Sequence, residues 1–182
     1  ALALTYSRSS YLAFLTGMGG LLALKKKMKV FSLIILLILI TVIILPKGLP
    51  SEGVKLARIA SIEARIGNWK QALVIAKDHL LFGVGFNTYR YTQKKYGFLK
   101  DDWQRSHAGG GADSSLLFVL ATSGVLGLFG WLGLVGKILR VSRRKSFLVF
   151  SSTIAILVHC FFQNTFFYPW VLGWWMVILG TM

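Results

Sequence analysis

The distribution of apolar residues along the chain predicts helices that cross a membrane. Residues 30–45 carry no charge, and as a helix they would rise about 24 Å, which is most of a ~30 Å hydrocarbon core. A second uncharged run, 114–136, would rise about 34 Å as one helix, and a third extends from 147 to about 168. Weaker apolar runs occupy 9–24 and 170–182. Because the sequence starts and stops inside apolar runs, we expect it to be a piece of a larger polytopic protein.

Two short basic clusters set the expected orientation of these helices. The clusters occupy 25–29 and 137–146, and two of the apolar runs separate them. Short cytoplasmic loops are enriched in Lys and Arg, so both clusters are expected in the cytoplasm. Two crossings between the clusters satisfy that requirement. We therefore predict multi-pass insertion, with transmembrane helices in 1–45 and 114–182.

The segment 46–113 is then expected on the external side. It contains all six acidic residues of the chain, from Glu52 to Asp113. Its 11 Lys+Arg and 6 Asp+Glu give a net charge of +5. Long translocated segments are largely exempt from the charge rule, so this basic excess does not oppose an external location.

The net charge of the chain indicates a kind of partner only when it is considered together with the hydropathy. A net charge of +15 on 182 residues would ordinarily indicate a nucleic-acid partner, which needs a basic face on a polar domain. This chain is 55% hydrophobic and its mean hydropathy is +0.64, so we expect cations that flank membrane helices and no nucleic-acid partner. A signal peptide is the competing interpretation of 25–45. The apolar segment before it, and the missing small-x-small cleavage site before Pro46, favour an internal helix.

An amphipathic helix is predicted inside the external segment, from Gly53 to about Phe82. Ser51 provides a capping residue, and Gly83 provides a stop. Apolar residues recur at steps of three and four, which is one helical stripe, namely Ile59, Ile62, Ile66, Trp69, Leu73, Ala76 and Leu80. The basic residues lie off this stripe, as expected for solvated cations or for a helix resting on a membrane surface.

The motifs of nucleotide and metal sites are missing from the sequence. Gly83 and Gly85 lack the glycine spacing and the preceding strand of a phosphate-binding fingerprint, and no Walker-type Lys-Ser/Thr occurs. Cys160 is the single cysteine, and no Cys/His cluster has metal-binding spacing. We therefore expect no ATP, no metal and no other cofactor.

Four short segments follow one another in an informative order. They are Thr5-Tyr6-Ser7-Arg8-Ser9-Ser10, Arg65-x-x-x-Trp69-x-x-Ala72-Leu73, His79-Leu80-Leu81-Phe82-Gly83-Val84-Gly85, and Ser115-Leu116-Leu117 with Ser123-Gly124-Val125-Leu126-Gly127-Leu128. They are similar to the Ser-Arg turn, the loop helix, the His-Pro-Leu-x-Gly-x-Gly element and the following helix of the bacterial O-antigen ligase and polymerase family. The chain resembles this family over essentially its whole length. It departs at Leu80, which replaces Pro, and at Gly111-Ala112-Asp113, where the family commonly has His-Asn.

The resemblance implies a fold and an activity. The fold is an all-α polytopic transmembrane helical bundle, with 46–113 as a long external catalytic loop that contains the amphipathic helix. The activity is transfer of a glycan from an undecaprenyl-diphosphate-linked donor to a hydroxyl of a glycan or lipid acceptor, without metal, at the outer face of the bacterial cytoplasmic membrane. Ligation and polymerisation both fit. The alternatives are a protein oligosaccharyltransferase and a non-enzymatic transporter or flippase of lipid-linked sugars.

Arg8 and Arg65 are the expected ligands of the donor diphosphate. A guanidinium group is preferred there because its planar fork binds two phosphate oxygens at once. Arg8 lies beside a predicted membrane helix on the outer side, where a cation faces either a polar cavity or lipid headgroups. Contact with lipid phosphates is the competing interpretation of Arg8.

His107 and Asp113 are the expected catalytic residues. A neutral His accepts the proton of an acceptor hydroxyl near pH 7, and Asp113 either orients His107 or replaces it as the base. The competing interpretations are a solvated loop His and an ordinary helix cap. Aromatic residues of the loop either stack on sugar rings or pack within the loop itself, and they are Tyr89, Tyr91, Tyr96 and Trp103.

Overall fold

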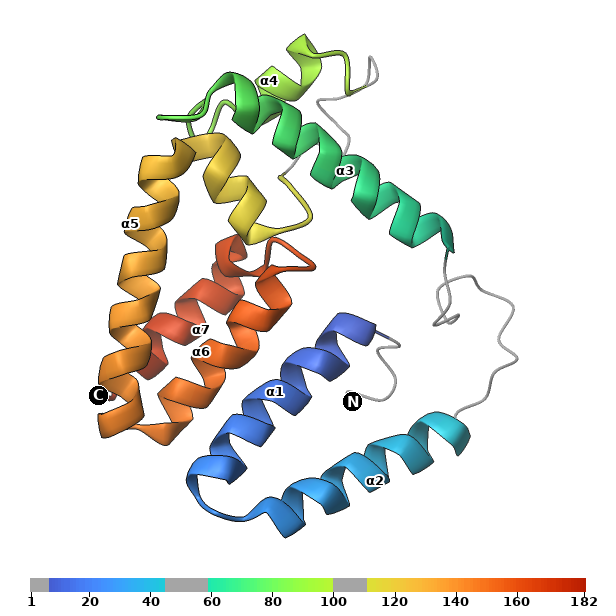
Figure 1. Ribbon diagram of the computed structural model, residues 1–182, viewed down its shortest axis with the longest axis vertical. Coiled ribbons are helices and arrows are strands. Elements are labelled where there is room, and N and C mark those ends of the chain that lie inside the picture. The colour runs from blue at the N-terminus through green and yellow to red at the C-terminus, as the bar shows by residue number, and fades with distance from the viewer. Residues whose placement is uncertain (1–6, 45–58, 100–110) are drawn as a thin grey trace. The chain divides into compact units, whose positions relative to one another are not determined.

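The structure is a computed structural model that describes residues 7–44, 59–99 and 111–182. Every regular element in these ranges is helical, which confirms the all-α prediction for the described chain (Figure 1). The elements are α1 (Arg8–Leu24), α2 (Met28–Ile44), α3 (Ile59–Asp78), α4 (Tyr89–Lys95), α5 (Ser115–Lys145), α6 (Phe147–Cys160), η4 (Thr165–Phe167) and α7 (Pro169–Leu179).

The chain divides into two compact units. The first, here called the hairpin unit, comprises 1–59, 139–159 and 173–182. The second, here called the loop unit, comprises 60–138 and 160–172. Most of the predicted external segment therefore belongs to the loop unit, and each unit is described by itself.

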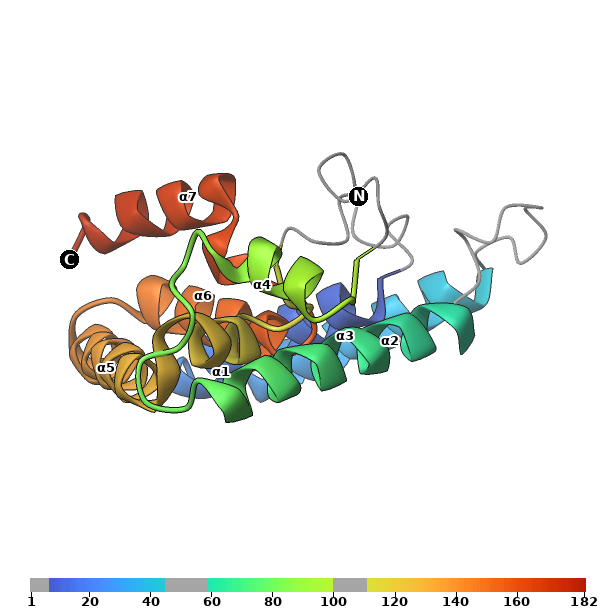
Figure 2. The ribbon, with the colours of Figure 1, turned by 90° about the horizontal axis from the view of Figure 1, so that it is seen from above.

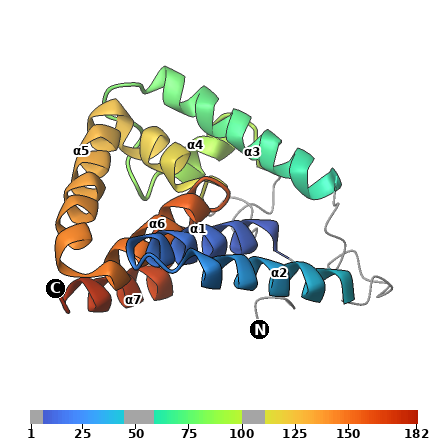
Figure 3. The same cartoon turned by 60° about the horizontal axis from the view of Figure 1, so that its bottom comes forward.

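In the hairpin unit, α1 and α2 form a helical hairpin that packs on α6. Lys26 takes a left-handed backbone conformation (φ 54°) in the short turn between α1 and α2. A Cβ at Gly17 of α1 would lie 2.8 Å from Ala155 Cβ and 3.1 Å from the backbone oxygen of Ser151, so glycine permits this close approach. Farther along α1, Gly20 lies beside Ile154. Helices α1 and α6 run antiparallel, as Figures 1 and 3 show.

This antiparallel packing brings the two basic clusters to one end of the hairpin unit. The end of α1 leads into residues 25–29, and the start of α6 follows residues 137–146 directly. The sequence assigned both clusters to the cytoplasm from charge alone, and the packing of α1 on α6 is compatible with that assignment. Arg8, the first residue of α1, lies at the opposite end of the helix, about 24 Å away along its axis.

The loop unit is built around a small core that α3, α4 and the start of α5 share. Ala72, Ile75 and Ala76 of α3, Tyr89 of α4, and Phe118 and Ala121 of α5 are all buried there, with Ala112. Burying one large apolar side chain contributes about 1.5–3 kcal/mol. Tyr96 donates a 2.6 Å hydrogen bond to the carboxylate of Asp78, which ties the end of α4 to the end of α3.

A break at Gly124 divides α5. Gly124 has φ 67° and ψ −169°, outside the helical region, and Figure 1 shows the resulting bend. Hydrogen bonds run in both directions across the break, from Gly85 N–H to the carbonyl of Thr122 (2.8 Å) and from Val125 N–H to the carbonyl of Leu80 (2.8 Å). The segment between α3 and α4 thus wraps the N-terminal part of α5 (Figures 1 and 2). The expectation of one continuous helix over 114–136 was wrong for this reason.

The third predicted run is also shorter than expected. The sequence predicted apolar helix from 147 to about 168, but α6 ends at Cys160. A turn follows, and then η4, where Phe166 N–H donates to the hydroxyl oxygen of Ser115 (3.2 Å). Because the start of α5 already provides this polar partner, the chain leaves the helix without leaving the Phe166 N–H unpaired.

The predicted amphipathic helix forms, but its packed face differs from the predicted stripe. Within the described chain it runs as α3, ends at Asp78 and continues as turns up to Gly83, which has φ 67°. Ile62, Ile66 and Leu73 of the stripe are 39–43% exposed. Ala72 and Ile75, which lie beside the stripe, are buried together with Ala76 of the stripe, in the core that also contains Ala121. The packed face therefore lies to one side of the predicted stripe and shares Ala76 with it.

Membrane-spanning length is reached by one element of the described chain. By length and composition α5 is long and apolar enough to cross a membrane, although it is broken at Gly124. Met28–Thr41, Phe147–Cys160 and Pro169–Leu179 are shorter apolar helices. The assignment of 1–45 and 114–182 to the membrane and of 46–113 to the external side stays a prediction.

Candidate functional site

The backbone of Asp113 is held by two side chains of α3. The amide oxygen of Asn68 accepts a 2.6 Å hydrogen bond from Asp113 N–H. The indole N–H of Trp69 donates a 3.0 Å hydrogen bond to the carbonyl of Asp113. Both main-chain groups of Asp113 are therefore fixed by one turn of helix, immediately before α5 begins at Ser115.

Arg65 and Asp113 interact electrostatically at this position. Arg65 lies three and four residues before Asn68 and Trp69, so these three side chains share one face of α3. Burial raises the pKa of the Asp113 carboxyl above its ordinary value, and the charge of Arg65 opposes that shift. A partly desolvated carboxylate beside a guanidinium group combines a proton acceptor with a cation that can bind an anionic leaving group.

Tyr89 and Gln93 add buried polar groups to the same region. Tyr89 is 2% exposed, and its ring packs edge-on against Phe118 with a centroid distance of 5.4 Å. Burial, and then the negative charge of Asp113, raise the pKa of the Tyr89 phenol. Among the described residues, the Tyr89 hydroxyl and the Gln93 amide have no hydrogen-bond partner. Buried polar groups are nearly always paired, so these two mark the surroundings of Asp113 as unusual.

The turn after α6 contacts the segment that leads into α5. A Cβ at Gly111 would lie 2.8 Å from the Asn164 amide nitrogen and 3.6 Å from the Phe118 ring. The Ser115 hydroxyl donates a 3.4 Å hydrogen bond to the carbonyl of Gln163. Glycine at 111 therefore allows the segment leading to Asp113 to pass directly over Asn164.

The structure brings together only part of the predicted site. Arg65 and Asp113 belong to the loop unit, and the charge of Arg65 acts to lower the pKa of the Asp113 carboxyl. Arg8 belongs to the hairpin unit, where it is the exposed first residue of α1 and follows the capping residue Ser7. His107 and Trp103 lie outside the described residues.

Comparison with known proteins identifies the family of the chain. Residues 1–132 match the profile of the O-antigen ligase family. The chain belongs to this family. The match contains every predicted site residue, including Arg8, Arg65 and Asp113. No curated protein and no solved structure matches the chain.

Family membership confirms the resemblance that the sequence motifs indicated. O-antigen ligases are membrane-associated enzymes of bacteria, and membership indicates glycan transfer of the ligase or polymerase type. Residues 79–85, which contact α5 at Gly124, are the segment that resembles the His-Pro-Leu-x-Gly-x-Gly element of the family. Its glycines have a steric role here, since a Cβ at Gly83 would overlap the backbone of Thr122.

Sequence reasoning missed three contributors to the site. Asn68 and Trp69 were read as parts of a helix, although their spacing from Arg65 already placed them on its face. For Tyr89 the sequence left open sugar stacking and packing within the loop, and its buried ring bears out the second interpretation, but its place beside Asp113 was not foreseen. Among the other loop aromatics, Tyr91 is 64% exposed.

Proposed function

We propose that this chain carries the catalytic loop of a glycosyltransferase that uses an undecaprenyl-diphosphate-linked donor. The acceptor is a hydroxyl of a glycan or lipid at the outer face of the cytoplasmic membrane. The observation that carries the proposal is the anchoring of the Asp113 backbone by Asn68 and Trp69, on the helix face that also carries Arg65. Family membership supports the reaction class.

The reaction makes two demands that these residues meet. A base removes the proton of the acceptor hydroxyl while its oxygen forms a bond to the anomeric carbon of the donor sugar. On the opposite face the bond from that carbon to the diphosphate oxygen breaks, which inverts the anomeric centre and releases the lipid diphosphate. The leaving group is strongly anionic, and the guanidinium of Arg65 stabilises the charge that develops on it.

The base is assigned to His107, with Asp113 as the residue that orients it. The assignment rests on chemistry, because a neutral imidazole accepts a proton near pH 7 and a carboxylate fixes its tautomer. Arg8 is assigned to the diphosphate as a second cation, at the outer end of α1 in the proposed topology.

Substitution of Arg65 tests the proposal. Membranes containing the full-length protein would be supplied with a lipid-linked glycan donor and an acceptor, and the transferred glycan would be followed by gel shift. Arg65→Lys should lower turnover about 100-fold, because a point charge does not reproduce the bidentate fork. Lys70→Arg is the matched control, since Lys70 is exposed on the same helix, and it should keep normal turnover. Normal turnover of Arg65→Lys would contradict the assignment.

The same assay separates the two assignments of the base. His107→Ala should lower turnover about 100-fold or more, the usual scale for one acid-base group. If His107→Ala turned over normally while Asp113→Asn did not, the carboxylate would be the base. If both variants turned over normally, the base assignment would fail, and a transporter of lipid-linked sugars would become the better interpretation.

A further inference from the structure

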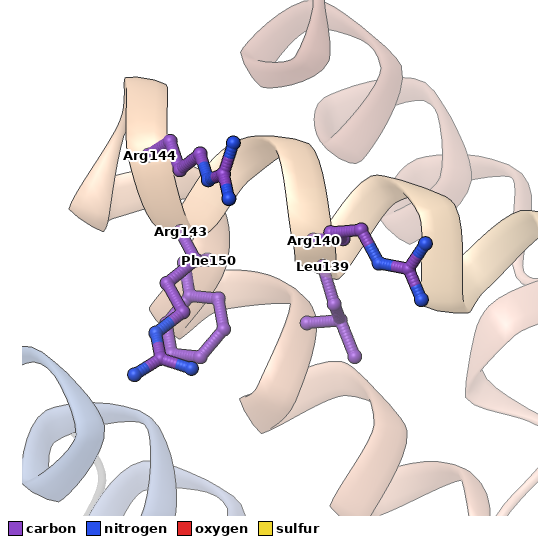
Figure 4. A pocket seen from close by; sticks show the side chains of 5 residues that line it. All are labelled: Leu139, Arg140, Arg143, Arg144 and Phe150. Atoms are coloured by element: carbon purple, nitrogen blue, oxygen red, sulfur yellow. The ribbon is translucent and has the colours of Figure 1, made fainter.

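A pocket in the hairpin unit is lined by three arginines. It has a volume of about 490 Å³ and is formed by Leu139, Arg140, Arg143 and Arg144 at the end of α5 and by Phe150 of α6. Figure 4 shows these side chains projecting from the two helices. The lining thus combines three guanidinium groups with two apolar walls.

Helical spacing gathers the three cations. Residues three and four positions apart are neighbours on a helix surface, so Arg140 lies next to both Arg143 and Arg144, while Arg143 turns toward Phe150 (Figure 4). Cations in the last turn of a helix are favoured by its dipole, but that effect is small for exposed charges. It does not by itself explain why the arginines surround a pocket.

Protein counterions are missing from the described part of this unit. Its described residues, 7–44, 59, 139–159 and 173–182, include no Asp and no Glu. The mutual repulsion of the three guanidinium groups is therefore not offset by a carboxylate in this part of the chain. The antiparallel packing of α1 on α6 places a further basic cluster, 25–29, at the same end of the unit. An anion bound in the pocket would balance this positive charge.

The apolar walls identify the kind of anion. Leu139 and Phe150 line the pocket itself, and Phe147 and Leu148, in the first turn of α6, are 42% and 59% exposed. A free phosphate ion has no apolar group to bury against these side chains. A phospholipid carries acyl chains in addition to its phosphate. Basic pockets at the cytoplasmic ends of membrane helices are known to hold anionic headgroups.

We propose that this pocket binds an anionic phospholipid of the inner leaflet. The phosphodiester lies between Arg140, Arg143 and Arg144, and the start of an acyl chain lies against Leu139 and Phe150. Guanidinium forks bind two phosphate oxygens at once, which favours Arg over Lys at this position. The inference requires membrane association, which family membership indicates, and does not depend on the identity of the catalytic residues.

Lipid binding to the purified full-length protein tests the proposal. The protein would be titrated in detergent with phosphatidylglycerol, or with phosphatidylcholine as the neutral lipid, and bound lipid would be counted by native mass spectrometry. Phosphatidylglycerol should bind, and simultaneous Arg140→Gln, Arg143→Gln and Arg144→Gln should weaken it at least about 10-fold. The control with equal loss of charge, Lys25→Gln with Lys26→Gln and Lys27→Gln, should change binding less than about 2-fold.

Each other outcome overturns the inference. If the arginine and lysine variants weakened phosphatidylglycerol binding equally, the lipid would be attracted by the overall positive charge of this end of the unit and not by the pocket. Competition by millimolar inorganic phosphate, or equal binding of phosphatidylcholine, would show that the headgroup and chain are not recognised together. If the glutamine variant does not insert, Arg140→Lys with Arg143→Lys and Arg144→Lys keeps the charge and should still weaken binding at least about 3-fold. Unchanged binding in that variant would equally contradict the proposal.

Discussion

The side-chain oxygen of Asn68 accepts a 2.6 Å hydrogen bond from the backbone N–H of Asp113. This contact joins two residues 45 positions apart and fixes where the chain enters α5. It also holds the carboxylate of Asp113 within the electrostatic reach of Arg65. The position of the proposed catalytic carboxylate is thus set by a residue with no chemical role of its own.

Removing this contact should lower activity without removing any reacting group. Asn68→Ala leaves the partly buried Asp113 N–H unpaired, which costs about 1–3 kcal/mol, and a displaced carboxylate should reduce turnover about 10-fold or more. Glycan transfer in membranes measures the effect. Asn87→Ala, in the exposed loop before α4, is the control and should behave as the unsubstituted protein. A normal rate for Asn68→Ala would show that Asp113 is positioned by other contacts.

Asp113→Asn should separate stability from activity. Because burial raises the folded-state pKa of Asp113, the folded protein favours the protonated form more than the unfolded chain does. The charged carboxylate therefore reduces stability once the pH rises above the ordinary pKa, and the cost is complete above the raised value. Asp113→Asn should raise Tm at pH 7 and change it little at pH 3, while turnover falls. A lower Tm at pH 7 would show that the carboxylate stabilises the fold.

The break in α5 depends on glycine at one position. Gly124 has φ 67°, and a Cβ there would overlap the carbonyl of Leu81. Gly124→Ala should destabilise the loop unit by roughly 1–3 kcal/mol or more, through backbone strain and displacement of the wrapped segment. Limited proteolysis at neutral pH should then cleave the segment between α3 and α4 faster. Gly130→Ala is the control, because nothing lies within 4 Å of a Cβ there, and comparable cleavage of both variants would refute the steric argument.

The proposed topology predicts which cysteines an impermeant reagent reaches. In right-side-out vesicles, Lys95→Cys should react with an impermeant maleimide, whereas Lys27→Cys and Lys145→Cys should react only in inverted vesicles. All three lysines are exposed, and the native Cys160 is buried, which keeps background labelling low. Labelling of Lys27→Cys and Lys95→Cys from the same side would overturn the external assignment of 46–113.

The sequence by itself determined the helical class and the family, and it supplied the residues that are proposed for the reaction. Apolar runs and helical spacing are local properties, and the motif around Arg65 and Trp69 is read directly from residue order. The positions of the charges are also read directly from the sequence. Both basic clusters could therefore be assigned to the same side of the membrane before any packing was known.

Only the tertiary structure decided where helices stop and which faces meet. The run 114–136 is uninterrupted in apolar character, yet α5 breaks at Gly124 because Leu80 and Gly85 supply hydrogen bonds from a distant segment. Tyr89 became part of the core because Phe118 lies against it. The anchoring of Asp113 by Asn68 depends on a contact across 45 positions, and no local pattern encodes such a contact, since its free energy arises only when both segments are packed.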